Sequence, residues 1–241
     1  MILGERLNQW GIEVVEFDFD DTLVRTEAVF TTQMRGFVAQ TMGRLGGRDM
    51  SEVWDRLEQV NNQAFRELSV NPKRWETVVA RMEEAFPEGS GVFAAALPNL
   101  MDIYKILPQL HDGAIETIEA FRMAGVKVGM VTHANEEWTK FKLDGLGLRE
   151  YFERIYIVDE NKHKGPEDWA QAIEEFGATP DQVMVIGDSL PGDIRASANI
   201  GVRHRVWVPS KWVMYNSGEI PEGTIRVDNI GQVVNALLAA V

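Results

Sequence analysis

Two aspartates, Asp18 and Asp20, follow a run of apolar residues that includes Val14, Val15 and Phe17. β-branched and aromatic residues favour a buried strand. Residues i and i+2 of a strand point to the same side, so both carboxylates would project together from its carboxyl end. Carboxylates that close raise each other's pKa unless a cation lies between them. Such oxygen ligands suit Mg²⁺, and a carboxylate held by a metal can attack phosphorus.

The same stretch has an alternative interpretation. Asp18-Phe19-Asp20-Asp21-Thr22 is also compatible with an ordinary turn from a strand into a helix, in which an acid serves as the N-cap. The choice between a chemical site and a simple turn depends on which polar residues follow the later strands.

Composition limits the classes of function. The chain has 241 residues, enough for one large domain or for a core domain with an insertion. It has no Cys, which excludes disulfides and Cys-zinc sites. Its net charge of −13 argues against binding to nucleic acid or to an anionic membrane surface. The N-terminus lacks the pattern of a signal peptide, and no apolar run approaches the roughly 18 residues of a membrane span. These features predict a cytoplasmic protein, and they do not indicate an oligomeric state.

Residues 26–106 are predicted to be helical almost throughout. Phe30, Met34 and Phe37 begin a series of apolar residues at helical spacing. Similar series occupy residues 53–68 and 75–86, and a short apolar piece then leads to Pro98. A last short helix is expected to stop before Pro108.

The pattern changes after residue 106 to an alternation of strands and helices. Strands are predicted at 126–131, 155–158, 183–186 and 204–208, with a possible edge strand at 224–227. Such alternation is typical of an α/β fold, here a doubly wound, parallel, Rossmann-like sheet. The expected core is formed by residues 1–25 and 107–241, and residues 26–106, called the insertion below, would form an all-helical cap. In such sheets ligands bind beyond the carboxyl ends of the strands.

Polar residues follow four of these strands and would therefore meet at one edge of the sheet. They are Asp18, Asp20 and Thr22 after the first strand, Thr132 and His133 after the second, Lys162, His163 and Lys164 after the third, and Asp188, Ser189 and Asp193 after the fourth. Together they supply carboxylates for a metal, and a hydroxyl and an ammonium for phosphate oxygens. Phosphoryl transfer depends mainly on such placement of charge.

This series of motifs resembles the haloacid dehalogenase-like hydrolase superfamily, and the insertion resembles the helical cap of its phosphatases. The family pattern is Asp-x-Asp-x-Thr, then a Thr or Ser after the second strand, a Lys, and Gly-Asp-x-x-x-Asp. The matching residues are Asp18 to Thr22, Thr132, a lysine within 162–164, and Gly187-Asp188 to Asp193.

The resemblance implies a role for each acid. Asp18 would attack phosphorus, and Asp20 would protonate the leaving group and then activate water. Asp18, the backbone carbonyl of Asp20, and Asp188 would hold Mg²⁺. Thr22 would steady the Asp20 side chain.

The resemblance also implies phosphate-binding groups. Thr132 and a lysine would bind the phosphoryl oxygens, and Asp193 would support the metal or orient the lysine. The family often has Lys-Pro at this point, where the chain has Lys164-Gly165-Pro166. Lys164 is preferred because Pro166 would open the next helix, and Lys162 is the alternative.

The function implied is a Mg²⁺-dependent phosphatase that acts on a small phosphorylated metabolite through an aspartyl-phosphate. The true dehalogenases of the family lack an acid at the position of Asp20, so its presence favours phosphate chemistry. Two alternatives are a phosphomutase that uses the same aspartyl-phosphate and a catalytically silent phosphate-binding protein.

Other residues near these motifs have simpler interpretations. His133 could touch the substrate but is expected to pack beside the site. Trp212 and Tyr215 could line a pocket or an interface but are expected to pack within their own loop. His163 is expected to be solvated. Some polar residues of the insertion could face a substrate, and these are Asn61, Asn62, Lys73, Arg74 and Asn99.

Overall fold

The centre of the molecule is a six-stranded parallel sheet with the strand order β3-β2-β1-β4-β5-β6. The computed structural model describes residues 2–240. The strands are β1 (Val14–Phe17), β2 (Lys127–Thr132), β3 (Arg154–Ile157), β4 (Val183–Gly187), β5 (His204–Trp207) and β6 (Thr224–Arg226). The expected parallel sheet is confirmed, including β6 at its edge.

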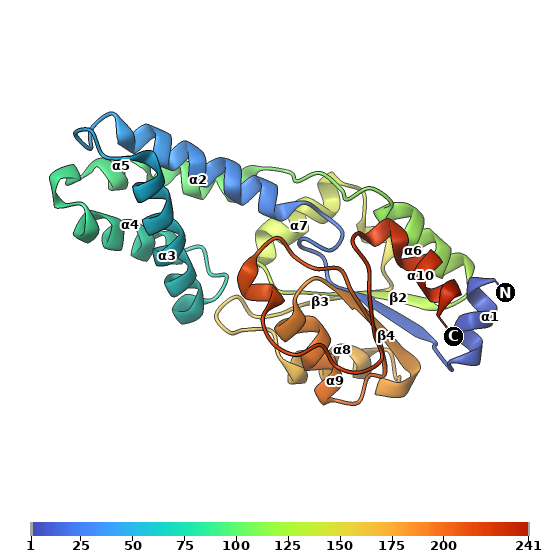
Figure 1. Ribbon diagram of the computed structural model, residues 1–241. Coiled ribbons are helices and arrows are strands. Elements are labelled where there is room, and N and C mark those ends of the chain that lie inside the picture. Colours follow the sequence, from blue (N-terminus) through green and yellow to red (C-terminus); the bar gives the residue numbers. More distant parts are fainter. Residues whose placement is uncertain (1, 241) are drawn as a thin grey trace.

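Helices cover both faces of this sheet (Figure 1). One face carries α1, α6 and α10, and the other carries α8 and α9. The helices of the core are α1 (Leu3–Gln9), α6 (Ala114–Met123), α7 (Glu136–Gly145), α8 (Pro166–Glu175), α9 (Ala196–Asn199) and α10 (Val233–Ala239). The molecule therefore has the doubly wound, Rossmann-like α/β architecture that the sequence predicts.

The register of the central strands brings polar residues together. In β1, Phe17 is level with Met130 of β2 and with Ile186 of β4. Asp18 follows Phe17 directly, and its backbone N–H donates to the carbonyl of Ile186 over 2.8 Å. Asp188 follows the end of β4, so the two acids leave the sheet at the same edge.

The insertion consists mainly of α2 (Thr26–Met42), α3 (Met50–Leu68), α4 (Arg74–Ala85) and α5 (Val92–Met101). Figure 1 shows these four helices together at one end of the molecule. Their buried apolar residues form a cluster of their own, to which Trp138 of α7 also contributes. The division of the chain into residues 1–25 with 107–241 and residues 26–106 stays a prediction, and this cluster favours it.

Two helices were not predicted as such. The short apolar piece before Pro98 is part of helix α5, which continues through Pro98 because α5 is packed between neighbouring helices that outweigh the loss of one backbone hydrogen bond. Helix α1 was not expected from its short pattern, and it forms because Leu3 and Leu7, one turn apart, are both buried against the core.

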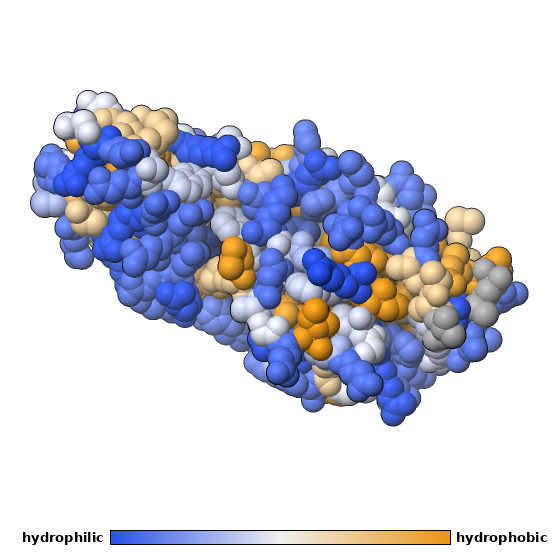
Figure 2. Space-filling model, viewed as in Figure 1, coloured by the Kyte–Doolittle hydropathy of each residue, from blue (hydrophilic) through white to orange (hydrophobic). Residues whose placement is uncertain are grey.

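The face of the molecule in Figure 2 is mostly hydrophilic, with hydrophobic residues in small separate patches. Within residues 2–240, every helix is too short or too polar to cross a bilayer.

One buried charge lies inside the sheet. The side chain of Glu16 in β1 is almost completely buried, and its Oε2 has no hydrogen-bond partner among the described residues. Glu16 lies opposite Gly129, where a Cβ atom would come within 2.3 Å of that oxygen. Burial, with a contribution from Glu175, raises the pKa of Glu16 well above its ordinary value.

We predict that Glu16→Gln stabilises the protein at about pH 8 by about 1–3 kcal/mol, because the cost of burying an ionisable group is removed. The unfolded chain ionises Glu16 above its ordinary pKa of 4.5, whereas the folded chain keeps the proton to higher pH. Stability from this group is therefore lost as the pH rises, and the gain from Glu16→Gln should shrink at about pH 5.5. Thermal unfolding at both pH values measures this, and an equal gain at both would contradict it.

Candidate active site

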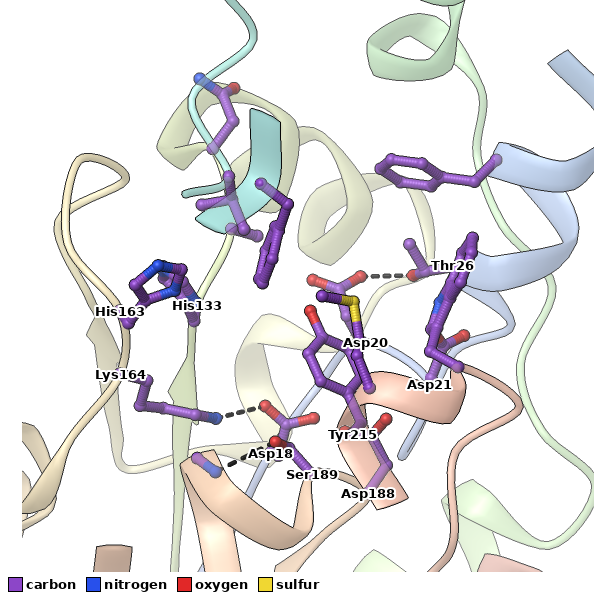
Figure 3. Close-up of a pocket in the computed structure, with 18 of the residues that line it drawn as sticks. Asp18, Asp20, Asp21, Thr26, His133, His163, Lys164, Asp188, Ser189 and Tyr215 are labelled. Atoms are coloured by element: carbon purple, nitrogen blue, oxygen red, sulfur yellow. Dashed lines mark hydrogen bonds and ion pairs between the residues drawn. The ribbon is translucent and has the colours of Figure 1, made fainter. Parts of the chain in front are cut away.

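Asp18 lies at the carboxyl end of β1 and is almost fully buried. Its Oδ1 accepts a hydrogen bond from Lys164 Nζ over 2.6 Å, and its Oδ2 accepts one from the Thr22 hydroxyl over 2.9 Å. Figure 3 shows the Lys164 side chain pointing at Asp18. Thr22 was expected to steady Asp20, and in the structure it orients Asp18 instead.

Asp20 faces the same pocket with different partners. Its Oδ1 accepts from the hydroxyl of Thr26 and from the ammonium of Lys142, and Figure 3 shows Thr26 turned toward it. Lys142 is fully buried, with Nζ 5.0 Å from the ring centroid of Phe19 and 4.0 Å from that of Trp138. A buried ammonium therefore pairs with one of the two aspartates of the first motif.

Sequence analysis missed both Lys142 and Thr26. A signal for Lys142 was available, because it lies one helical turn after Trp138 and so shares the buried face of α7. Lys is almost never fully buried unless it is paired, so a lysine on an apolar helix face predicts a buried acid opposite.

Asp18, Asp188 and Asp193 form a buried acidic cluster. Each offers one carboxylate oxygen, and these oxygens lie within 4.8 Å of one another. Burial and the neighbouring carboxylates raise the pKa of Asp188 well above its ordinary value. Burial also raises the pKa of Asp18 to about 7, against the effect of Lys164. Such a cluster is unfavourable unless a cation shares it.

The donor set of this cluster fits Mg²⁺. Asp188 Oδ2 is buried and has no hydrogen-bond partner among residues 2–240, so it is free to bind a cation. Asp193 is already engaged, since its Oδ2 accepts the backbone N–H of Ser189 over 2.9 Å and its Oδ1 pairs with Lys164 over 2.5 Å. Asp188 Oδ2 is therefore the oxygen of the cluster that no other described residue engages, whereas both oxygens of Asp18 are held by Lys164 and Thr22. Asp18 and the carbonyl of Asp20 as further metal ligands stay predictions.

The structure separates the two candidate lysines. Lys164 is buried between Asp18 and Asp193, and although burial lowers its pKa, the two carboxylates outweigh this and raise it. Lys162 is partly exposed and pairs with Asp168 over 2.5 Å. The structure thus brings Lys164 to the cluster and holds Lys162 elsewhere.

Thr132 ends β2 and is fully buried. Its hydroxyl has no hydrogen-bond partner within the described chain. An unpaired buried hydroxyl is costly, but Thr132 is not among the residues that line the pocket described next. Its role in binding phosphate stays a prediction.

A pocket of about 300 Å³ lies between these strand ends and the insertion. Asp18, Asp20 and Asp188 line one end of it. Aromatic residues line much of the remainder, namely Phe30, Phe65, Tyr104, Trp138, Trp212 and Tyr215.

Several expectations about the surrounding residues are corrected by this pocket. Trp212 and Tyr215 line it, and Trp212 Nε1 also donates to Asp21 Oδ2 over 3.1 Å. His163 is exposed, as expected, and it also contributes to the wall. Among the polar candidates of the insertion, the pocket is lined by Asn61, Asn62 and Arg74 but not by Lys73 and Asn99.

His133 lines the pocket and connects it to the insertion. The Ser69 hydroxyl donates to the carbonyl of Lys162 over 2.8 Å, so its oxygen is left to accept a hydrogen bond from His133 Nε2, also at 2.8 Å. Burial lowers the pKa of His133 to about 4, with Lys164 adding to the effect. His133 is therefore neutral at neutral pH.

Comparison with known proteins agrees with this arrangement. The family model described as "haloacid dehalogenase-like hydrolase" matches residues 12–201. The chain belongs to the haloacid dehalogenase-like hydrolase family. The resemblance drawn from the motifs is thereby confirmed, and the chain is a hydrolase of this family.

Individual members of the family resemble the chain over most of its length. A phosphoglycolate phosphatase of Thiobacillus denitrificans is 33% identical over 79% of this chain and 80% of its own. A glyceraldehyde 3-phosphate phosphatase of Methanopyrus kandleri is 27% identical over 79% of this chain and 82% of its own. The crystal structure of a haloacid dehalogenase-like hydrolase from Xanthomonas campestris has a TM-score of 0.75 at 21% identity, covering 95% of this chain and 91% of its own. That structure supports the fold.

We predict that Lys142→Met destabilises the protein by about 3–5 kcal/mol, because it leaves the Asp20 carboxylate without its buried cation. Asp20→Asn combined with Lys142→Met should recover at least about 1 kcal/mol of that loss, because the two residues are coupled. Chemical denaturation of the two single variants and the double variant measures the coupling. Lys140→Met is the control, since Lys140 lies on the same helix in an exposed pair with Glu136. Strictly additive effects would contradict the assignment.

Proposed function

We propose that the chain is a Mg²⁺-dependent phosphatase that hydrolyses a small phosphomonoester through an aspartyl-phosphate on Asp18. The observation that carries this proposal is the convergence of Asp18, Asp20, Lys164 and Asp188 at one end of a single pocket. The names of the two relatives, both phosphatases of small phosphorylated compounds, support the same class of reaction.

The first step is the transfer of the phosphoryl group. An oxygen of Asp18 forms a bond to phosphorus while the bond from phosphorus to the leaving oxygen breaks. Asp20 gives its proton to that leaving oxygen, which departs as an alcohol. Thr22 and Lys164 hold the Asp18 carboxylate in one orientation. Lys164, which also lines the pocket, would bind a phosphoryl oxygen.

The second step returns the enzyme to its starting state. Asp20 takes a proton from a water molecule, and the oxygen of that water attacks phosphorus. The bond between phosphorus and Asp18 breaks, and inorganic phosphate leaves. Thr26 and Lys142 keep the Asp20 side chain in place for both steps. When bound by Asp18, Asp188 and the Asp20 carbonyl, Mg²⁺ would neutralise negative charge on the phosphoryl group.

The insertion would act as a cap over these groups. Its helices α2, α3 and α4 contribute residues to the wall of the pocket, so they limit access of water and the size of the leaving group. Substrate selection is therefore expected to depend on residues of the insertion, whereas the chemistry depends on the strand ends.

We predict that the wild-type protein releases phosphate from 4-nitrophenyl phosphate and from some small phosphorylated metabolites, and that release requires Mg²⁺. Asp18→Asn should lower kcat at least roughly 1000-fold, because the nucleophile is removed. Phosphate release with Mg²⁺ and with chelator, for both proteins, measures this. Undiminished turnover by Asp18→Asn would overturn the mechanism, and an isomerised product without free phosphate would indicate a phosphomutase.

We also predict that the two lysines differ in effect. Lys164→Met should lower kcat/KM by roughly 100-fold or more, because a buried charge beside the nucleophile is lost. Lys162→Met is the matched control, and it should change kcat/KM by less than about threefold because Lys162 does not line the pocket and pairs with Asp168 instead of the acidic cluster. Thermal unfolding of each variant shows whether it is folded at the assay temperature. The opposite ranking would assign the phosphate-binding role to Lys162.

A further inference from the structure

We infer that Arg74 forms a second anion-binding site in the wall of the pocket, and that the leaving group of the substrate therefore carries its own carboxylate or phosphate. This inference rests on the proposed phosphatase function and adds the chemical class of the substrate to it.

Arg74 is the first residue of α4 and lines the pocket although only 4% of it is exposed. Three aromatic rings surround its guanidinium, whose central carbon lies 4.8 Å from the ring centroid of Trp75, 5.4 Å from that of Phe30 and 5.7 Å from that of Phe65. Its Nη1 donates to the carbonyl of Ser69 over 3.1 Å. These contacts fix the position of the group without neutralising its charge.

The guanidinium has no anionic partner. Among residues 2–240, no carboxylate lies within ion-pair distance of Arg74, and its buried Nε has no hydrogen-bond partner. Arg81 on the same helix shows the usual arrangement, since it pairs with Glu67 over 2.5 Å. Charged groups that are buried are normally paired. An unpaired, buried cation at the wall of a pocket is therefore suited to an anion that arrives from solution.

The charges around the pocket favour the same conclusion. Asp18, Asp20, Asp21 and Asp188 line it, and the protein has a net charge of −13. Lys164, the other basic residue of the wall apart from the histidines, is already engaged with Asp18 and Asp193. A second negative group on a substrate would be repelled here unless a local cation attracted it.

The chemistry of the guanidinium defines the class of ligand. Its planar fork matches a carboxylate or a phosphate through two parallel hydrogen bonds. A pocket of about 300 Å³ has room for such a group beside the transferred phosphoryl. The substrates in the names of the two relatives differ on this point, because phosphoglycolate carries a carboxylate and glyceraldehyde 3-phosphate has a neutral leaving group.

The first experiment compares substrates that differ in one charge. Phosphoglycolate is paired with 2-hydroxyethyl phosphate, and propanediol bisphosphate with 3-hydroxypropyl phosphate. We expect kcat/KM to favour the charged member of at least one pair by roughly 10- to 100-fold, mainly through KM. The preferred pair distinguishes a carboxylate from a second phosphate. Ratios near one in both pairs, with 4-nitrophenyl phosphate still hydrolysed, would overturn the inference and leave the phosphatase proposal intact.

The second experiment connects the preference to the residue. In Arg74→Gln the ratio should fall to about twofold or less, and Arg74→Lys should retain part of it because the charge remains. Arg81→Gln removes the same charge from the same helix and should leave the ratio unchanged. Thermal unfolding shows whether each variant is folded. A preference that survives Arg74→Gln in folded protein would overturn the assignment.

A third measurement does not depend on turnover. Calorimetry measures the binding of phosphoglycolate, 2-hydroxyethyl phosphate and propanediol bisphosphate to Asp18→Asn, with Arg74 intact and with Arg74→Gln. A preference for a charged ligand that requires Arg74 would support the anion site even if no phosphate ester were hydrolysed. Equal binding of charged and neutral ligands would reject the site.

Discussion

The structure depends on the burial of carboxylates at the edge of a parallel sheet. The register of β1 and β4 places Asp18 and Asp188 side by side, and the turn after β4 adds Asp193. Carboxylates that are this close together and this deeply buried are stable in their ionised form only if cations compensate their charge. Lys164 supplies one compensating charge to Asp18 and Asp193 from a segment far away in the sequence. The loop before α8, which carries Lys164, must therefore pack against the strand ends. This loop closes the site next to Asp18 and Asp193.

The Asp20 carboxylate also needs a compensating positive charge, and a different lysine supplies it. Lys142 approaches it from α7 with its ammonium held over aromatic rings. Asp18 and Asp20 thus each have their own lysine, so neither carboxylate depends on the other's counter-ion. Arg74 departs from this arrangement, since it is buried to a similar degree without any carboxylate. Lys142 and Lys164 compensate acids of the protein, whereas Arg74, which lines the pocket, is the cation that we propose for a ligand.

The sequence was sufficient where the determining interactions are local. Strand and helix periodicities predicted the parallel sheet, and motifs at strand ends placed Asp18, Asp188 and Lys164 at one edge. It was insufficient for the partners of Asp20, because Lys142 is 122 residues away in the chain. Which threonine contacts Asp20 depends on the backbone of the turn, where Asp21 has a φ of +61°. The pocket wall contributed by Trp212 and Tyr215 depends on how a loop folds back, which no periodicity encodes.

Ser69 connects the position of Arg74 to the chemistry at the strand ends. It is a non-glycine residue with a φ of +56°, a conformation that costs free energy and persists only where surrounding contacts require it. Here its hydroxyl is used in contacts with the core and its carbonyl in a contact within the insertion. Its hydroxyl contacts Lys162 and His133 of the core, and its carbonyl accepts the hydrogen bond from Arg74. One of the contacts between the insertion and the core therefore also fixes the guanidinium, so the proposed recognition of a second anion would depend on how the insertion sits over the nucleophile.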